Sequence, residues 1–174
     1  DSVESYSVLR SLAAVKRADM VLVVTDASEE LSEQDVKIAG FVHEQGKPSV
    51  ILVNKWDAVE KDSYTINKFD EKINADLAFM SYIKTLYISA KTGLRVDKII
   101  DCAEESYANA SKRIPTGTLN DVVSEAVAMN EPPSSSGRRL KIYYATQAET
   151  NPPKFVFFVN DDTLVHFSYR RYLE

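Results

Sequence analysis

Hydrophobic and polar positions fall into blocks along the chain, and these blocks predict an order of helices and strands. Residues 20–25 and 50–53 are apolar runs with almost no polar alternation, which is typical of strands buried on both faces of a parallel sheet. A shorter run at 86–88 predicts a third strand. Apolar residues recur at helical spacing in four further segments, residues 2–17, 32–46, 65–77 and 96–113. The alternation of helix and strand indicates an α/β fold with a doubly wound sheet.

The pattern changes after Arg113. Residues 114–117 (Ile-Pro-Thr-Gly) break the alternation, so we expect a first domain over residues 1–113 and a smaller second domain over residues 114–174. Beyond the break, a helix, two strands and a last helix are predicted to begin near residues 118, 140, 155 and 164. We expect the two strands to form a hairpin and residues 131–137, rich in Pro and Ser, to be a flexible connection. This order predicts a small α+β domain.

Polar residues at the end of the second strand form a candidate binding site. Asn54, Lys55 and Asp57 follow the run at 50–53, and ligands bind at the carboxyl ends of strands in open α/β sheets. An ionised Asp57 could accept hydrogen bonds from both the N1–H and the N2 amine of guanine, a pair that adenine lacks. Losing such a partner can change the affinity by about four to five orders of magnitude. Asn54 could bridge the base to neighbouring loops, and the Lys55 stem could cover the ring.

A second group of polar residues, Ser89-Ala90-Lys91, follows the third strand. The Ala90 backbone N–H could donate to guanine O6, Ser89 could brace the Asp57 carboxylate, and Lys91 could lie on the other face of the base. Either motif alone is also compatible with an ordinary polar turn. Two strand ends with complementary groups favour a guanine site.

These motifs resemble the fourth and fifth guanine-recognition motifs of the translation-factor-type P-loop GTPases. Longer phrases resemble the second GTPase domain and the KH-like tail of the Der (EngA) family of bacterial ribosome-assembly GTPases, at residues 6–10, 33–35, 38–40, 53–57 and 140–147. The resemblance covers essentially the whole chain. It implies the C-terminal half of a doubly wound P-loop GTPase sheet, followed by a KH-like domain with helix-strand-strand-helix order that is truncated before its last strand.

The resemblance also implies ligands and partners. GTP and GDP are the implied ligands, and this chain would hold the guanine part of the site. The implied partners are the large ribosomal subunit with its rRNA, and a preceding GTPase domain of the same chain. We expect a cytoplasmic protein with no membrane partner.

The hydrolytic half of a GTPase site is missing from the sequence. The phosphate-binding loop, Gly-x4-Gly-Lys-Ser/Thr, does not occur, and the resemblance begins after the switch threonine and the Asp-x-x-Gly turn. Mg²⁺ is implied for the parent GTP hydrolase, but its ligands are not in this stretch. We therefore assign no catalytic and no metal-binding residue. We expect the chain alone to bind GTP or GDP weakly and to hydrolyse nothing.

Composition excludes several other classes of protein and kinds of site. The chain has 174 residues and a net charge of −5, so it is not a generically basic nucleic-acid binder. Cys102 is the single cysteine, which excludes an internal disulfide and a cysteine metal cluster. No apolar run is long enough to span a membrane. Asp26, after the first strand, is interpreted as the cap of a turn or helix and not as a metal ligand.

The tail leaves an alternative function open. A KH domain that binds single-stranded RNA clamps the backbone with a Gly-x-x-Gly loop, and the tail has no such loop. Arg138, Arg139 and Lys141 could contact phosphates, although basic residues beside a loop are more often solvated. The alternative is a nucleotide-independent module that binds RNA or a ribosomal protein, with the α/β part as a scaffold.

Overall fold

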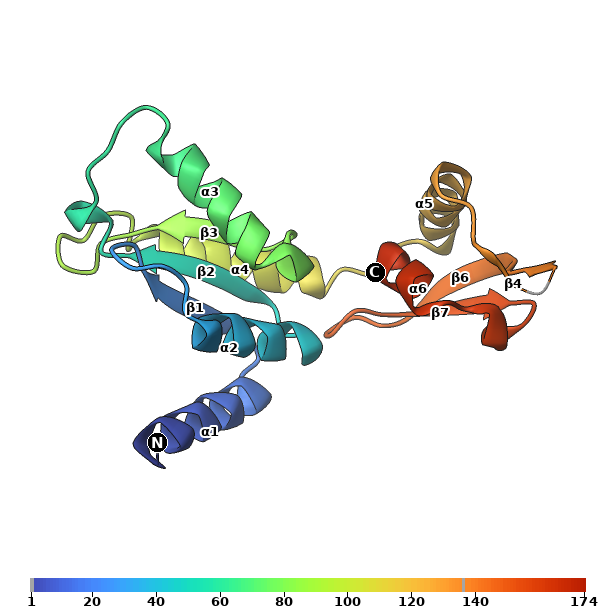
Figure 1. The fold of residues 1–174 in the computed structure, drawn as a ribbon, viewed down its shortest axis with the longest axis horizontal. Helices are drawn as coiled ribbons and strands as arrows, with labels where there is room; N and C mark the ends of the chain where they lie inside the picture. The colour runs from blue at the N-terminus through green and yellow to red at the C-terminus, as the bar shows by residue number, and fades with distance from the viewer. Residues whose placement is uncertain (1, 136) are drawn as a thin grey trace. The chain divides into compact units, whose positions relative to one another are not determined.

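The protein is described by a computed structural model that covers residues 2–135 and 137–174 (Figure 1). The chain divides into two compact units, Asp1–Ala110 and Ser111–Glu174. The first unit has two apolar cores, and the second unit has one of its own.

A three-stranded parallel sheet with strand order β1-β2-β3 forms the centre of the first unit. Its strands are β1 (Val21–Asp26), β2 (Ser49–Asn54) and β3 (Lys84–Tyr87). The helices are α1 (Ser2–Arg17), α2 (Glu33–Glu44), α3 (Thr65–Asp76) and α4 (Lys98–Ala110). Two short 3₁₀ turns, η1 (Trp56–Ala58) and η2 (Ala78–Met80), follow β2 and α3. The α/β class predicted from the sequence is confirmed.

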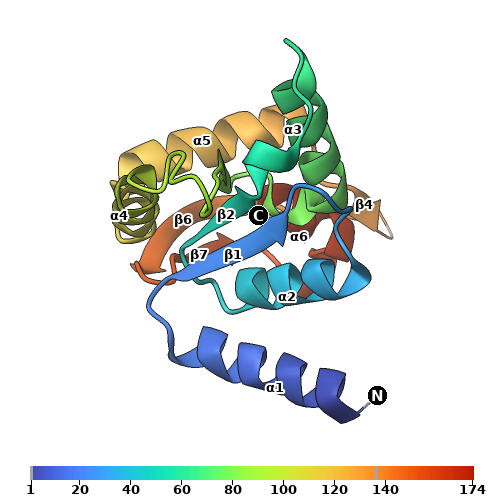
Figure 2. The same ribbon diagram turned by 90° about the vertical axis from the view of Figure 1, so that its left-hand side faces the viewer.

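Helices pack on both faces of this sheet (Figures 1 and 2). On one face, Ile51 and Val53 of β2 lie in a core with Ala39 and Val42 of α2 and with Ile73 of α3. The opposite face contains a second core, formed by Val50, Leu52, Ile88 and Cys102. Strand β2 is therefore buried on both faces, as its continuous apolar run predicts.

Strand β1 differs from its prediction. Leu22 and Val24 are 41% and 57% exposed. Helix α4 packs over β2 and β3 and leaves β1 uncovered on that face. The expectation that β1 is buried on both faces is therefore wrong. The helix predicted over residues 2–17 is present as α1; its amphipathic pattern favours packing on the sheet, but it lies along α2 on the side away from the sheet, and its Val15 reaches the core (Figure 2).

The second unit has one helix packed on an antiparallel pair of strands. The strands are β6 (Ile142–Glu149) and β7 (Lys154–Val159). Helix α5 (Thr116–Met129) covers one of their faces, where its Leu119 and Val123 form a core with Ala145 of β6. A 3₁₀ turn, η3 (Asp162–Leu164), leads into α6 (Phe167–Leu173). The predicted helix-strand-strand-helix order is present.

The connection between α5 and β6 has local structure that the sequence did not predict. Strands β4 (Ser134–Ser135) and β5 (Arg138–Arg139) pair as a small antiparallel hairpin. Arg138 forms an ion pair with Asp161 at 2.7 Å, and Arg139 forms one with Glu131. These two arginines, considered above as phosphate contacts, thus already have carboxylate partners.

Candidate functional site

The structure brings the two polar strand ends together. Because β2 and β3 are parallel neighbours, the residues that follow them lie at the same edge of the sheet. The Ser89 hydroxyl donates to Asp57 Oδ1 at 2.5 Å. The Ala90 backbone N–H donates to Asn54 Oδ1 at 3.0 Å. The predicted contact between Ser89 and Asp57 is present, and Asn54 bridges to the neighbouring loop.

The Asp57 carboxylate is prepared as an anionic acceptor. The Ser89 hydroxyl bond holds the pKa of Asp57 below its ordinary value of 3.8, and the positive charges of Lys91 and Lys61 lower it further. Asp57 is therefore ionised near neutral pH. The residue is exposed, so its carboxylate is accessible to a ligand with two adjacent donors.

A tight turn fixes the position of Ser89. Ser89 is fully buried, and its hydroxyl also accepts a hydrogen bond from the Thr92 backbone N–H at 3.1 Å. Gly93 has a φ of 80°, a conformation that favours glycine, and its N–H donates to the Ser89 carbonyl at 2.9 Å. Lys91 is exposed at the outside of this turn. The turn thus fixes the hydroxyl that contacts Asp57.

Lys55 is held by its backbone and by an acid from the first strand. It has φ 60° and ψ 29°, the left-handed conformation that is uncommon for a residue with a long side chain. Its ammonium pairs with Asp26. Asp26 also accepts hydrogen bonds from the backbone N–H and the hydroxyl of Ser28, at 2.9 and 2.6 Å. The interpretation of Asp26 as a turn cap is confirmed, but its pairing with Lys55 was missed.

The charge of Asp26 is already compensated by these contacts. The Lys55 ammonium and the two Ser28 donors lower the pKa of Asp26 from 3.8 to about 2. Of the two acids at this edge of the sheet, Asp26 is the structural partner of a lysine. Asp57 remains the one that is accessible to a ligand.

Aromatic side chains anchor the loop that carries Asp57. Trp56 is 2% exposed, and its ring lies 5.0 Å from that of Phe69 and 4.5 Å from that of Tyr87, measured between centroids. The Tyr87 hydroxyl donates to Asp70 Oδ1 at 2.6 Å, which links β3 to α3. The sequence pattern alone did not indicate this anchoring role. The apolar Trp between two polar neighbours was the available signal for a buried anchor.

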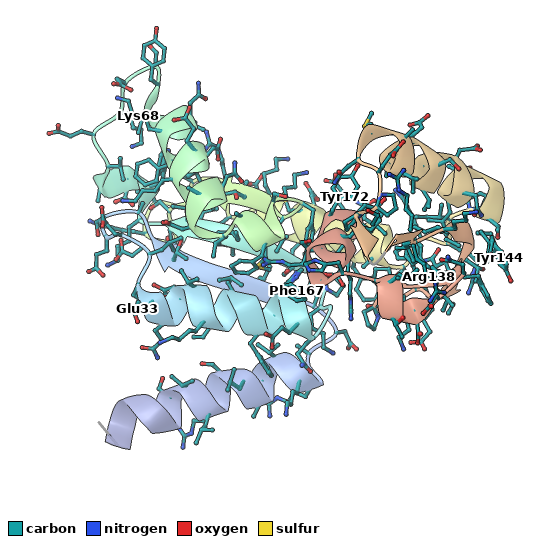
Figure 3. The ribbon with its side chains drawn as sticks, turned by 45° about the vertical axis from the view of Figure 1, so that its right-hand side comes forward. Glu33, Lys68, Arg138, Tyr144, Phe167 and Tyr172 are labelled. Atoms are coloured by element: carbon teal, nitrogen blue, oxygen red, sulfur yellow. The ribbon has the colours of Figure 1, made fainter. Side chains whose placement is uncertain are left out.

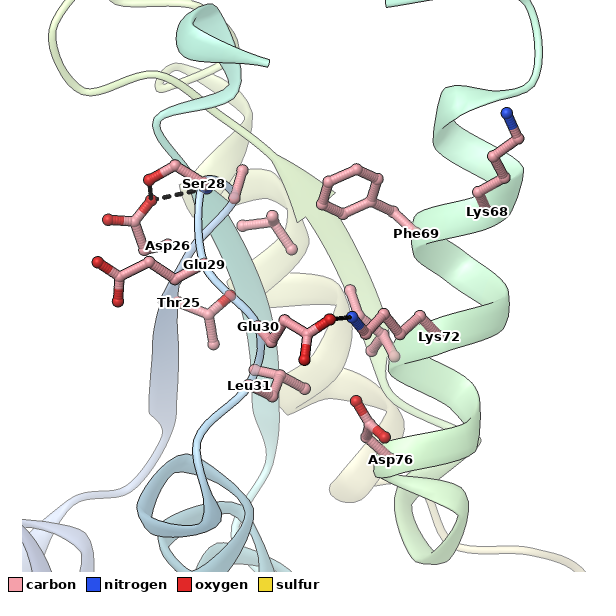
Figure 4. A pocket seen from close by; sticks show the side chains of 13 residues that line it. Thr25, Asp26, Ser28, Glu29, Glu30, Leu31, Lys68, Phe69, Lys72 and Asp76 are labelled. Atoms are coloured by element: carbon pink, nitrogen blue, oxygen red, sulfur yellow. Dashed lines mark hydrogen bonds and ion pairs between the residues drawn. The ribbon is translucent and has the colours of Figure 1, made fainter. Parts of the chain in front are cut away.

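A cavity of about 310 Å³ lies between the loop after β1 and helix α3 (Figure 4). Its apolar lining includes Leu31, Phe69 and Ile73, and Lys72 pairs with Glu30 across it at 2.5 Å. The cavity does not include Asn54, Asp57 or residues 89–91. We assign the candidate site to those residues because their hydrogen-bonding groups converge, whereas no such convergence is seen in the cavity, where Lys72 pairs with Glu30 and Asp26 is held by Ser28 and Lys55.

Within residues 2–135 and 137–174, no group of three or more His, Cys, Asp or Glu side chains is placed to hold a metal ion. Across the same part of the chain, no helix combines the length and the apolar character needed to cross a membrane.

Comparison with known proteins identifies the family. Residues 5–109 match the family model described as the elongation factor Tu GTP binding domain. The chain belongs to this family of GTP-binding domains. Residues 113–174 match the model described as KH-domain-like of EngA bacterial GTPase enzymes, C-terminal. The family to which the sequence motifs pointed is therefore confirmed.

Curated relatives match the whole chain. It is 54% identical over 174 residues to GTPase Der of Clostridium tetani (strain Massachusetts / E88) and 53% identical to GTPase Der of Agathobacter rectalis. Each comparison covers 100% of this chain and 40% of the relative. The chain thus spans about two fifths of the length of these relatives.

Two solved structures are more distant. A probable GTP-binding protein engB is 19% identical, covers 62% of this chain and 66% of its own, and has a TM-score of 0.47. Era in complex with MgGDPNP and nucleotides 1506-1542 of 16S ribosomal RNA is also 19% identical. That comparison covers 92% of this chain and 58% of the Era chain, with a TM-score of 0.48.

Proposed function

We propose that this chain recognises the guanine base of GTP or GDP at the adjacent carboxyl ends of β2 and β3. The observation that carries the proposal is the 2.5 Å hydrogen bond from Ser89 to Asp57, which orients an ionised, exposed carboxylate. Guanine presents N1–H and the N2 amine side by side, and a carboxylate can accept both. Adenine presents an acceptor at N1, so it would leave the charge without a partner.

The other residues have complementary roles in this proposal. The Ala90 N–H, which now donates to Asn54 Oδ1, would be shared with guanine O6. Asn54 would bridge the base to the turn after β3. The Lys55 ammonium is anchored on Asp26, so its methylene stem is available to cover one face of the ring, and Lys91 would cover the other face.

The hydrolytic reaction is not assigned to residues of this chain. The chain belongs to a family of GTP-binding domains, and its relatives are named GTPases. The sequence has no Gly-x4-Gly-Lys-Ser/Thr loop to hold the phosphates. No carboxylate cluster among the described residues suits Mg²⁺, so no metal ligand is assigned. We propose that this chain supplies base recognition, binds GTP or GDP weakly by itself and does not hydrolyse GTP.

The partner follows from the family resemblance. We propose that the parent protein is a cytoplasmic guanine-nucleotide switch with a further GTPase domain. It would assist assembly of the large ribosomal subunit and contact its rRNA. The support is the likeness of the whole chain to GTPase Der, together with the KH-like match over residues 113–174. The domain division that we propose for the chain is 1–113 for the GTPase part and 114–174 for the KH-like part.

The test of base recognition is the substitution Asp57→Asn. The amide offers a donor where xanthine carries a carbonyl in place of the guanine amine, so preference should change from GDP to XDP. Because we expect weak binding, NMR chemical-shift titrations of the chain with GDP, XDP and ADP are the measurement. A variant that keeps the wild-type preference for GDP would contradict the assignment and favour the nucleotide-independent alternative.

The matched control for this test is Asp26→Asn. It changes the other carboxylate at the same edge of the sheet, one that pairs with Lys55 and is not proposed to contact the base directly. It should weaken GDP binding without producing XDP preference, because the pair with Lys55 positions the stem over the ring.

A further inference from the structure

The strand pair of the second unit has one open face. Tyr144 lies opposite Phe158 and Thr146 lies opposite Val156 in the β6–β7 register. Helix α5 packs on the other face, where Ala145 is fully buried. We call Tyr144, Thr146, Val156 and Phe158 the aromatic face.

The two rings of the aromatic face form a parallel stack. The ring centroids of Tyr144 and Phe158 are 4.2 Å apart, and the ring planes differ by 10°. The two residues are 46% and 41% exposed, so the stack is only half covered by protein. Tyr144 is labelled on the second unit in Figure 3. Each ring uses one side against its neighbour, and the outer side can take another planar group. Tyr143, the residue before Tyr144, has a third exposed ring, which is 66% exposed.

The charges near the aromatic face suit a polyanion. Glu149 is the single acid in β6 and β7, and it is paired with Lys154 at 2.7 Å. Arg138 neutralises Asp161, which follows β7. The Lys141 ammonium, three residues before Tyr144, has no ion-pair partner among the described residues. The strands therefore present rings and a hydroxyl with no unpaired carboxylate, and Lys141 adds a cation directly before β6.

We propose that the aromatic face, together with Lys141, binds single-stranded RNA by stacking bases on the Tyr144–Phe158 pair. Base stacking on aromatic rings tolerates any sequence, because every base has a π-face. A β-sheet that exposes aromatic side chains is a suitable platform for unpaired bases, and a lysine beside it can contact the phosphate. This mode needs no Gly-x-x-Gly loop, which the tail lacks. The inference rests on the proposed RNA partner and specifies the surface that contacts it.

Ring-removing variants test this surface. Tyr144→Leu and Phe158→Leu keep an apolar side chain and remove the stack, and fluorescence anisotropy with fluorescein-labelled oligouridine measures the affinity of the whole chain. Each variant should weaken binding about 5- to 100-fold. The matched control is Phe167→Leu, which removes a 70% exposed ring of α6 outside the aromatic face and should leave the affinity unchanged.

Salt dependence supplies a second measurement that does not depend on the rings. Lys141→Gln should lower the slope of log affinity against log salt concentration by about 0.7, the value for one phosphate contact on a single strand. An unlabelled RNA duplex should compete poorly, because its bases are already stacked and paired. Circular dichroism establishes that each variant is folded, and Lys141→Gln is an exposed change that should not disturb folding.

The outcomes separate this inference from the proposed function. Oligouridine binding that survives both ring variants and Lys141→Gln would overturn the aromatic face and leave an RNA partner in place. No binding of oligouridine by the wild-type chain would overturn both the face and the RNA partner. Neither result affects base recognition, which is measured separately by the GDP and XDP titrations. Equal binding of the duplex and the single strand would also overturn the stacking mode.

Discussion

Two carboxylates at the same edge of the sheet have different roles because they have different neighbours. Asp26 faces an ammonium and two donors of Ser28, so its charge is compensated within the protein. Asp57 receives one hydroxyl hydrogen bond, and its lysine neighbours contribute only through their charge. Both pKa values are lowered, and the geometry of the contacts distinguishes the structural acid from the accessible one.

The Asp26 contacts predict a specific acid dependence of stability. The folded-state pKa is about 2, below the ordinary 3.8, so the folded state binds this proton less readily than the unfolded state. The stabilisation is complete above pH 3.8 and is lost as the pH falls toward about 2. Asp26→Asn should be less stable than wild type at neutral pH, and the difference should shrink across that interval. Urea midpoints at several pH values measure this.

Glu71→Gln is the control for the acid experiment. The Glu71 side chain is exposed on α3 and has no hydrogen-bond or ion-pair partner among the described residues. Its difference from wild type should not change over the same pH interval. If the stability difference between Asp26→Asn and wild type were also independent of pH, the charge of Asp26 would not contribute to stability through its pair with Lys55.

At the scale of elements, the sequence predicted the helices and strands that a local pattern of apolar residues defines. The run before Asn54 is apolar on both faces, and β2 is buried on both faces. The contact between Ser89 and Asp57 followed from two parallel strands that end at one edge. The pair between Lys55 and Asp26 was missed, although both residues lie at the ends of the neighbouring parallel strands β1 and β2. The left-handed backbone of Lys55 is a local feature that the apolar pattern does not reveal.

The open face of the second unit could not be predicted for a related reason. Strict alternation from Leu140 would place Ile142 and Tyr144 on the same face of the strand. A register shift between these two residues turns Ile142 toward the core and Tyr144 outward. A single extra residue thus decides which side chains are exposed, and the alternation pattern does not reveal its position.

The first turn of α2 gives a prediction at the same scale. Ser32 and Asp35 form a reciprocal capping box, with the Asp35 N–H donating to the Ser32 hydroxyl at 3.2 Å and the Ser32 N–H to the Asp35 carboxylate at 2.9 Å. Ser32→Ala should lower the free energy of unfolding by about 0.5–2 kcal/mol, because the cap is lost. Ser63→Ala, in an exposed loop, should change it by less than about 0.5 kcal/mol. Equal effects in urea titrations would argue against the cap.

The hydrogen bond between β3 and α3 gives another prediction. Burial raises the pKa of Tyr87, and the Asp70 carboxylate raises it further, so the hydroxyl remains a donor at neutral pH. Tyr87→Phe keeps the ring against Trp56 and removes the donor. The free energy of unfolding should fall by about 1.5–3 kcal/mol, the usual contribution of a hydrogen bond to a charged group. Urea titration followed by circular dichroism measures the loss, and an unchanged midpoint would contradict it.

At the scale of the whole molecule, the chain has two units with separate apolar cores. Leu119, Val123 and Ala145 form the core of the second unit and share no buried residue with the cores of the first. Gln147 of β6 is 4% exposed and connects this core to the start of the unit. Its amide donates to the Lys112 carbonyl at 3.0 Å and accepts from the Ile114 N–H at 2.7 Å. Regions with separate cores can unfold as separate cooperative units.

The Gln147 contacts predict a selective loss of stability in the second unit. Gln147→Leu would remove the hydrogen bonds to the Ile114 N–H and the Lys112 carbonyl, each of which contributes about 0.5–1.5 kcal/mol. Trp56 is the single tryptophan and lies in the first unit, so its fluorescence reports on that unit alone. In urea titrations, the fluorescence midpoint should match wild type, whereas a second transition seen by circular dichroism should move to lower urea. If both signals moved together, the units would unfold as one, and the second unit could not change its stability independently of the base-recognition site.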